Sequence, residues 1–263
     1  MKIGINEQII DVSDGSTLAN IRKKFKPNAD VCIVNGALIP DDIILQENDQ
    51  VMLIERGVMP PRDELEFVMA ARHTPGVHAK MRTSSVGIAG LGGLGSAVAV
   101  ALARMGVGRL VLVDFDVVEP SNLNRQQYFV DQLGQHKTLA LQENLKRINP
   151  YIQIDYHTDR IVPENIDSFF CDIDVLVEAF DGADQKAMLM QNVGKYPLVT
   201  ASGLAGHGSG ESIKVHKIGD SIYVVGDLQT GAKPGCGLMA PRVGIAAHMQ
   251  ANLVVQILLG DYE

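Results

Sequence analysis

The pattern of hydrophobic and polar positions divides the chain into two regions. In residues 1–57, short hydrophobic stretches alternate with turn signals such as Asn35-Gly36, which is typical of a small α+β unit. The pattern predicts one helix from about Thr17 to Lys24. It predicts five short strands, near Lys2–Ile5, Gln8–Val12, Asp30–Val34, Ala37–Ile39 and Gln50–Glu55.

Beyond Ser85, strands that are hydrophobic throughout alternate with helices. The predicted strands are Val86–Ala89, Leu110–Val113, Ile152–Tyr156, Val175–Glu178 and Leu198–Thr200, followed by a hairpin of Ile213–His216 and Ile222–Val225. The predicted helices include Leu94–Met105, Gln135–Ile148 and Arg242–Leu259. Strands that are hydrophobic on both faces and separated by helices indicate a mostly parallel sheet covered by helices on both faces. We therefore expect a Rossmann-like α/β domain after the small α+β unit.

The junction between the two regions contains Pro60-Pro61, which interrupts regular structure, and then a charged, helix-like stretch from Arg62 to Arg72. We expect three parts: a small domain of residues 1–57, a linker with a helix at 58–84, and a larger domain at 85–263.

Composition narrows the class of protein. The 263 residues include 23 basic and 31 acidic side chains, and the net charge of −8 argues against a nucleic-acid or anionic-membrane partner. The N-terminus lacks the pattern of a secretory signal, and the long hydrophobic segments are too short or too interrupted to span a bilayer. The three cysteines form no CxxC pair, so we expect a cytoplasmic protein.

The stretch GIAGLGGLGS indicates a nucleotide site. Gly90, Gly92 and Gly95 follow a predicted strand and open a helix, where backbone amides meet phosphate groups. Asp114 ends the next strand, where a carboxylate accepts hydrogen bonds from ribose hydroxyls. The glycines alone leave open whether the nucleotide is a nicotinamide cofactor or ATP.

The residues that follow favour ATP. After Asp114 come the run DFDVVEPSNLNRQQYF and then Lys137, in the first turn of the next predicted helix. A later stretch, EAFDGADQKA, begins at Glu178. Cations at fixed positions neutralise the charge of a leaving pyrophosphate, which a phosphate-transferring site needs and a hydride-transferring site does not. For the loop carboxylates Asp116 and Glu119 we expect no more than solvation.

Together these motifs resemble the ThiF/MoeB/HesA adenylyltransferases, relatives of the ubiquitin-activating enzymes, over about residues 62–259. The tracts ARHTPGVHAK and MAPRVGIAAHMQAN look most like the ThiF branch. The N-terminal region likewise resembles the β-grasp fold of ubiquitin and of small sulfur carriers such as ThiS.

The resemblance implies an enzyme that uses ATP and magnesium to adenylate the C-terminal carboxylate of a small Gly-Gly-ended β-grasp sulfur carrier, in thiamine or related sulfur-transfer biosynthesis. It implies catalytic roles for Arg125, Lys137 and Asp181, with Asp181 as the magnesium ligand, and a homodimer. The nucleotide-binding set that it implies is Gly90, Gly92, Gly93, Gly95, Asp114, Ser121, Asn122, Leu123, Asn124, Arg125, Gln126, Lys137, Asp181 and Gly182.

Three other functions stay open at this point. One is a catalytically reduced scaffold that binds nucleotide and a β-grasp partner, another is an NAD-dependent oxidoreductase, and the third is an enzyme that activates a carboxylate on a tRNA base. The adenylyltransferase agrees best with the residue types, because an ionised carboxylate attacks without a general base, and alignment and charge neutralisation are sufficient.

The chain departs from the family pattern at three places. It lacks the two CxxC pairs that bind zinc in many relatives, so we expect no zinc. Cys236, in AKPGCGLMAPRV, is open to both an inert role and a covalent step with the carrier. The β-grasp stretch continues past Gly57 into the larger domain instead of ending in Gly-Gly, so we expect a fused module that is not itself the acceptor.

Overall fold

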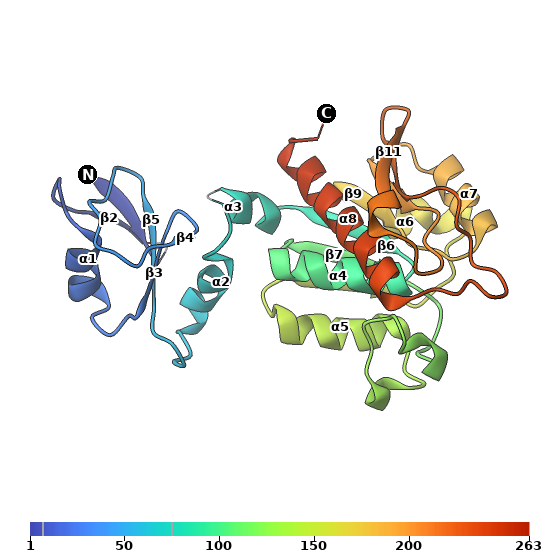
Figure 1. The fold of residues 1–263 in the computed structure, drawn as a ribbon, viewed down its shortest axis with the longest axis horizontal. Helices are drawn as coiled ribbons and strands as arrows, with labels where there is room; N and C mark the ends of the chain where they lie inside the picture. Colours follow the sequence, from blue (N-terminus) through green and yellow to red (C-terminus); the bar gives the residue numbers. More distant parts are fainter. Residues whose placement is uncertain (7, 75, 263) are drawn as a thin grey trace. The chain divides into compact units, whose positions relative to one another are not determined.

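The structure is a computed structural model that describes residues 1–6, 8–74 and 76–262. The chain folds as two compact units, Met1–Ala79 and Lys80–Glu263, and the elements of each can be followed in Figure 1.

The first unit contains a five-stranded sheet in the order β2-β1-β5-β3-β4. The two central strands, β1 and β5, run parallel, and β2, β3 and β4 are added antiparallel. The elements are β1 (Lys2–Ile5), β2 (Gln8–Asp11), α1 (Leu18–Phe25), β3 (Val31–Val34), β4 (Ala37–Leu38), β5 (Gln50–Ile54) and α2 (Arg62–Ala70). This arrangement is the ubiquitin-like β-grasp fold that the sequence predicts.

Helix α1 begins where Thr17 accepts a hydrogen bond from the amide of Asn20, and its buried residues Leu18 and Ile21 pack on the sheet. Helix α2 is tied to this unit by Glu64, which accepts hydrogen bonds from Lys26 and Asn6. The short helix α3 (Val77–Arg82) spans the boundary between the two units.

The second unit is built on a seven-stranded sheet in the order β11-β12-β10-β9-β6-β7-β8. All neighbouring strands are parallel except the hairpin β11–β12. The strands are β6 (Ser85–Ala89), β7 (Arg109–Val113), β8 (Gln153–His157), β9 (Val175–Glu178), β10 (Leu198–Ala201), β11 (Lys214–Ile218) and β12 (Ile222–Gly226). The chain moves outward in one direction from β6 and in the other from β9, so the topological switch point lies between these two strands.

Helices cover both faces of this sheet (Figure 1). Helix α4 packs against α5 and α8, while the opposite face forms a core cluster with α6 and α7 around Phe170 and Leu189. The helices are α4 (Gly93–Met105), α5 (Lys137–Ile148), α6 (Ile166–Phe169), α7 (Ala183–Asn192) and α8 (Ala240–Leu259). Four 3-10 turns accompany them, η1 (Pro120–Asn122), η2 (Val130–Gln132), η3 (Pro163–Asn165) and η4 (Gly210–Ser212).

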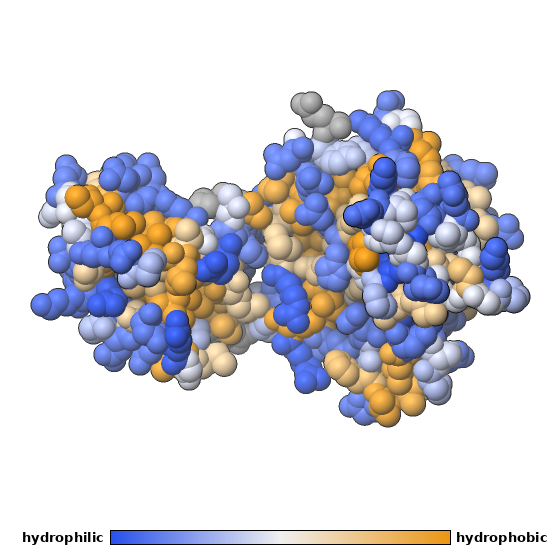
Figure 2. Space-filling model, viewed as in Figure 1, coloured by the Kyte–Doolittle hydropathy of each residue, from blue (hydrophilic) through white to orange (hydrophobic). Residues whose placement is uncertain are grey.

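Helix α8 is, among the described residues, the one helix long and apolar enough to cross a bilayer by length and composition. In the fold it packs against α4, β9, β10 and β12, with residues such as Val254 and Gln250 fully buried. Its hydrophobic composition is therefore explained by the core of its own unit. Figure 2 shows one face of the molecule, on which hydrophobic and hydrophilic groups are both exposed in each unit.

The predicted elements of the second unit are present, with ends that differ by one or two residues. Helix α5 begins at Lys137 instead of Gln135, and α8 begins at Ala240 instead of Arg242. The sequence pattern did not predict α6 or the four 3-10 turns, because segments of three or four residues are too short to show a helical period.

Candidate functional site

A cavity of about 400 Å³ lies at the carboxyl ends of the parallel strands. Its walls come from the turns that follow β6, β7, β9 and β10, on both sides of the switch point. Ligands of open α/β sheets bind at this place, and the volume is within the range of small-molecule sites.

The glycine-rich turn between β6 and α4 forms one wall of the cavity. Gly90 has a φ of +89°, a conformation that favours glycine, and its carbonyl oxygen lies 1.9 Å from where a Cβ of Gly95 would be. Gly95 therefore allows α4 to approach the turn closely. Gly92 and Gly93 line the cavity, and the N-terminus of α4 faces it at Gly93.

Asp114 holds this turn in place. Its Oδ2 accepts a hydrogen bond from the amide of Leu91 at 2.6 Å, and its Oδ1 accepts one from the amide of Asp116 at 2.8 Å. Burial raises the pKa of the Asp114 carboxyl, against the lowering effects of Lys137 and these two amides. On the other side of the turn, the buried Tyr128 hydroxyl donates to the carbonyl of Leu91 at 2.8 Å.

Three polar side chains from the run after Asp114 reach the cavity. Lys137 is buried, and its Nζ lies 2.9 Å from Oδ2 of Asp116. Arg125 donates to the Asn124 side chain at 2.8 Å and to the Ser121 carbonyl. Gln126 is buried, and its Oε1 has no hydrogen-bond partner among the described residues.

The expectation that Asp116 is only a solvated loop carboxylate is wrong. Its side chain is 49% exposed, yet it lines the cavity and is the ion-pair partner of Lys137. The cause is the turn after β7, in which Val117 and Val118 fold back along residues 134–136 and bring Asp116 over the start of α5.

The turn after β9 brings Asp181 to the cavity as an exposed carboxylate. Lys186, one turn into α7, also lines the cavity, and its Nζ donates to both oxygens of the fully buried Glu178 at 2.9 and 3.0 Å. Sequence reasoning did not assign Glu178 or Lys186, although both stand in the stretch EAFDGADQK that drew attention to Asp181. Among the described residues no group of three His, Cys, Asp or Glu side chains is placed to hold a metal by itself.

The wall opposite the glycine-rich turn is made mostly of small residues. They come from the end of β10 and from the segments after β10 and β12, namely Ala201, Ser202, Gly203, Ala205, Thr230, Gly231 and Ala232. The side chains of these seven residues are small and uncharged, so they add no charge to this wall.

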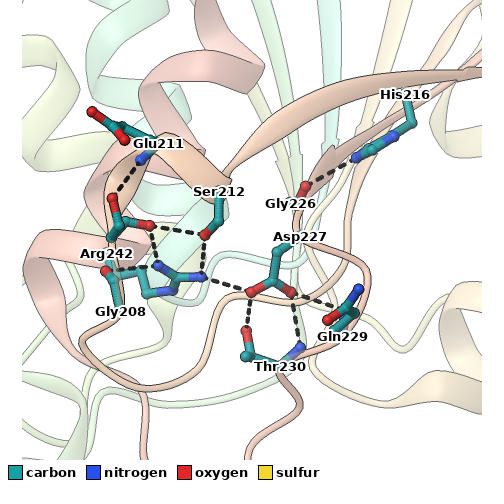
Figure 3. A network of polar contacts seen from close by, with 10 residues as sticks. Gly208, Glu211, Ser212, His216, Gly226, Asp227, Gln229, Thr230 and Arg242 are labelled. Carbon is teal, nitrogen blue, oxygen red and sulfur yellow. Dashed lines mark hydrogen bonds and ion pairs between the residues drawn. The ribbon is translucent and has the colours of Figure 1, made fainter.

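A buried network fixes the segments behind this wall (Figure 3). Arg242, only 4% exposed, donates to the carbonyl oxygens of Gly208 and Ser209, to the Ser212 hydroxyl, and to Oδ2 of Asp227 at 2.7 Å. Burial alone would raise the pKa of Asp227, but hydrogen bonds from Thr230 and Gln229, with Arg242, lower it to about 2. One arginine thus holds the 208–212 segment, the end of β12 and the start of α8 together.

The structure brings only part of the predicted nucleotide-binding set to the cavity. The lining contains Gly90, Gly92, Gly93, Asp114, Arg125, Gln126, Lys137 and Asp181. The predicted residues outside it are Gly95, Ser121, Asn122, Leu123, Asn124 and Gly182. Asn122 is buried and accepts from the Glu119 amide, and Asn124 contacts Arg125, so both support the loop that presents Arg125 and Gln126.

Two family models match the chain. One, described as the ThiF family, matches residues 68–263, and the other, described as ThiS-like ubiquitin, matches residues 1–57.

Among curated proteins, the molybdopterin-synthase adenylyltransferase of Escherichia coli is 31% identical over 189 residues, which cover 68% of this chain and 75% of that protein. The adenylyltransferase and sulfurtransferase UBA4 of Candida glabrata is 30% identical over 210 residues, 74% of this chain. The matched part spans about half of that relative, 47% of its length.

Among solved structures, the tRNA N6-threonylcarbamoyladenosine dehydratase TcdA of E. coli, solved in complex with ATP, superimposes with a TM-score of 0.68. The match covers 77% of this chain and 97% of that one at 22% sequence identity. At this identity the likeness establishes the shared fold.

Proposed function

Because the chain belongs to the ThiF family, we propose that it is an adenylyltransferase that uses ATP and magnesium to adenylate the C-terminal glycine carboxylate of a small β-grasp sulfur carrier. Pyrophosphate is the second product, and the activated carrier serves thiamine or related sulfur-transfer biosynthesis. The observation that carries the proposal is the cavity at the switch point, which brings together the glycine-rich turn, the cations Arg125 and Lys137, and the exposed carboxylate of Asp181.

In this proposal ATP occupies the half of the cavity between β6 and β7. The amides of the glycine-rich turn and the N-terminus of α4 face its phosphates at Gly92 and Gly93, and Asp114 faces the ribose. Arg125 and Lys137 neutralise the phosphates, and Lys137 exchanges its contact with Asp116 for a phosphate oxygen.

The charges of the cavity favour a nucleotide that enters with a divalent cation. The lining carries four carboxylates, Asp114, Asp116, Asp159 and Asp181, against the three cations Arg125, Lys137 and Lys186. A bare triphosphate would add to an excess of negative charge. Mg²⁺ is normally held by one or two carboxylates together with substrate phosphates, and the exposed Asp181 is suited to this role. When bound, the ion withdraws charge from the phosphate oxygens.

The residue types of the cavity favour an acceptor that is already ionised. Of the described residues that line it, none is a histidine or a cysteine. A carboxylate oxygen attacks the α-phosphorus directly, the bond from that phosphorus to the bridging oxygen breaks, and pyrophosphate leaves while an acyl-adenylate forms. No proton has to be removed from the nucleophile, so alignment and charge neutralisation supply the catalysis.

The small residues in the cavity wall opposite the glycine-rich turn support a narrow peptide tail as the acceptor. Ala201, Ser202, Gly203 and Gly231 leave room for a chain of glycines and would give little recognition of a large planar base. The ThiS-like unit of this chain does not offer such a tail, since β5 ends at Ile54 and the chain continues into α2. We therefore propose that residues 1–57 act as a fused module that stabilises the protein or recruits the separate carrier.

ATP–pyrophosphate exchange tests the proposal. Candidate Gly-Gly-ended carriers are added one at a time, and one of them should stimulate exchange. Arg125→Ala and Lys137→Ala should each reduce exchange by roughly a hundredfold or more, the loss seen when one charge-stabilising donor is removed. Lys146→Ala, an exposed lysine on the same helix as Lys137, is the matched control and should retain full exchange. Cys236→Ala should also retain it, because Cys236 does not line the cavity.

A second candidate acceptor is a carboxylate on a tRNA base, which the likeness to a tRNA dehydratase supports. The net charge of −8 weighs against an RNA partner. The exchange assay separates the two, because stimulation by tRNA and by no carrier would refute the carrier assignment. Tight binding of NAD without exchange would refute adenylation altogether. We further expect a homodimer, which sedimentation of the full chain will test.

A further inference from the structure

Glu178, the last residue of β9, has a carboxyl group with every acceptor position in use. It is fully buried, and its Oε1 accepts from the Phe180 amide at 2.5 Å and from Lys186 at 3.0 Å. Its Oε2 accepts from Lys186 at 2.9 Å and from the Thr200 hydroxyl. Glu178 therefore joins three parts of the site, which are the turn that carries Asp181, the ammonium of Lys186, and the end of β10.

Lys186 is the side chain that this carboxylate orients. Its ammonium has three N–H donors, and the contacts with Glu178 use two of them. The side chain is 21% exposed and lines the cavity, so the third donor is available to a ligand. A buried ion pair stabilises a fold little better than hydrophobic residues of the same size, so stability alone gives a weak reason for this pair.

The position of Lys186 separates it from the other cations. Arg125 and Lys137 follow β7 in the chain, on the nucleotide side of the glycine-rich turn. Lys186 follows β9, and its partner Glu178 also binds Thr200, which directly precedes the small residues of the opposite wall. β9 lies next to β10 in the sheet, and through Glu178 and Thr200 Lys186 is linked to the wall of small residues that we propose for the acceptor.

We propose that Lys186 binds the carboxylate of the acceptor and that Glu178 is the positioning residue that holds its ammonium there. This inference rests on the proposed function. Attack brings a carboxylate against a phosphate, and like charges resist that approach unless a donor accompanies the incoming anion. Since Glu178 already balances the charge of Lys186, the remaining N–H orients the carboxylate without holding it as tightly as an unpaired ammonium would.

The test compares the wild type with Lys186→Met, which keeps a long apolar side chain and removes the donor. Carrier adenylation is measured with carrier and ATP varied separately, and a carrier that ends in a carboxamide is used as a competitor. A charge-assisted hydrogen bond corresponds to roughly ten- to hundredfold in affinity. We expect the KM for the carrier to rise by about this factor, the KM for ATP to change less than about twofold, and the preference for the carboxylate over the carboxamide to disappear.

Lys186→Met leaves Glu178 buried and unpaired, so that variant can fail to fold. The double variant Lys186→Met with Glu178→Gln removes both charges and keeps hydrogen-bonding groups for Thr200 and Phe180. Once its folding is verified by circular dichroism, it should show the same loss of carboxylate preference. Lys146→Met, on the exposed face of α5, controls for the loss of a lysine elsewhere and should behave as the wild type.

The results distinguish this inference from the function on which it rests. If the wild type shows no exchange with any carrier, the proposed function is refuted, and this inference with it. If the wild type is active and the folded variants keep both the KM for the carrier and the carboxylate preference, only the role of Lys186 is refuted. A rise confined to the KM for ATP would likewise refute it, because it would place Lys186 on the nucleotide.

Discussion

Replacing Asp227 by Asn tests whether the buried Arg242 network holds the wall of the cavity opposite the glycine-rich turn (Figure 3). The substitution keeps the shape of the side chain and removes its charge. In the wild type the two side chains are 11% and 4% exposed, and Oδ2 of Asp227 lies 2.7 Å from Nη2 of Arg242. The variant leaves the arginine charge buried beside a neutral amide.

The magnitude follows from the pKa of Asp227. A fall from the ordinary value of 3.8 to about 2, caused by hydrogen bonds from Thr230 and Gln229 and to a smaller extent by Arg242, corresponds to about 2.5 kcal/mol of folding free energy at neutral pH for the whole network. Because the folded-state pKa is the lower one, this contribution is complete above the unfolded value of 3.8 and is lost as the pH falls through about 2. At roughly 2–4 °C per kcal/mol for a unit of this size, Tm should fall by about 5–10 °C at pH 7.

Thermal unfolding of the second unit, followed by circular dichroism at pH 7 and near pH 2.5, measures the effect. The matched control is Asp167→Asn, which breaks the ion pair of Asp167 with Lys195 at the same 2.7 Å distance but with both side chains 67% exposed. Solvent screening leaves such an exposed pair with little effect on stability. An equal fall in Tm in the two variants would refute the reasoning. A difference in Tm between the wild type and Asp227→Asn that is as large near pH 2.5 as at pH 7 would also refute it.

Two further predictions concern the nucleotide side. Gly95→Ala should weaken ATP binding and lower Tm, because the new Cβ would lie 1.9 Å from the Gly90 carbonyl oxygen. Such overpacking costs about 1–3 kcal/mol. The control Gly92→Ala should leave Tm nearly unchanged, because its Cβ would meet only the Gln126 side chain, at 3.9 Å. Equal Tm values for the two variants would contradict this prediction. An ATP affinity of Gly95→Ala equal to that of the wild type, measured by calorimetry, would contradict it as well. Chelation of divalent cations should abolish ATP–pyrophosphate exchange. Asp181→Asn should raise the magnesium concentration needed for half-maximal exchange by about tenfold or more. An unchanged magnesium dependence in this variant would show that Asp181 is not a magnesium ligand.

The lining of the cavity between β6 and β7 was predictable because its residues are close together in the sequence. The glycine-rich turn, Asp114 and the run that ends at Gln126 follow two neighbouring strands, and each stands in a recognisable context. The fold was predictable for a related reason, since strands that are hydrophobic on both faces indicate a covered parallel sheet. The structure added that Asn122 and Asn124 support the loop, whereas Gln126 reaches the cavity.

The wall of small residues, which we propose for the acceptor, was not predictable because chain segments far apart in the sequence form it. Arg242 and Gly208 are 34 residues apart, and no local pattern marks them as partners. From the sequence alone, an Arg in the first turn of a helix and a Glu at the end of a strand are both expected to have exposed side chains, because charged residues are rarely buried. Only tertiary pairing places Arg242 and Glu178 in the interior.

The two halves of the cavity also differ in what holds them. Backbone amides and glycines build the nucleotide side, so its geometry follows from the local path of the chain. The acceptor side depends on two buried ion pairs, Glu178 with Lys186 and Asp227 with Arg242, which fix the ends of β9, β10 and β12. Buried pairs contribute little net stability but are costly to break, so they restrict a loop to one position. In the proposed function this wall meets a peptide tail whose carboxylate has to be aligned on the α-phosphorus, and small side chains alone cannot supply that alignment by packing. The ion pairs behind it supply the rigidity that the glycines and alanines in front of it lack.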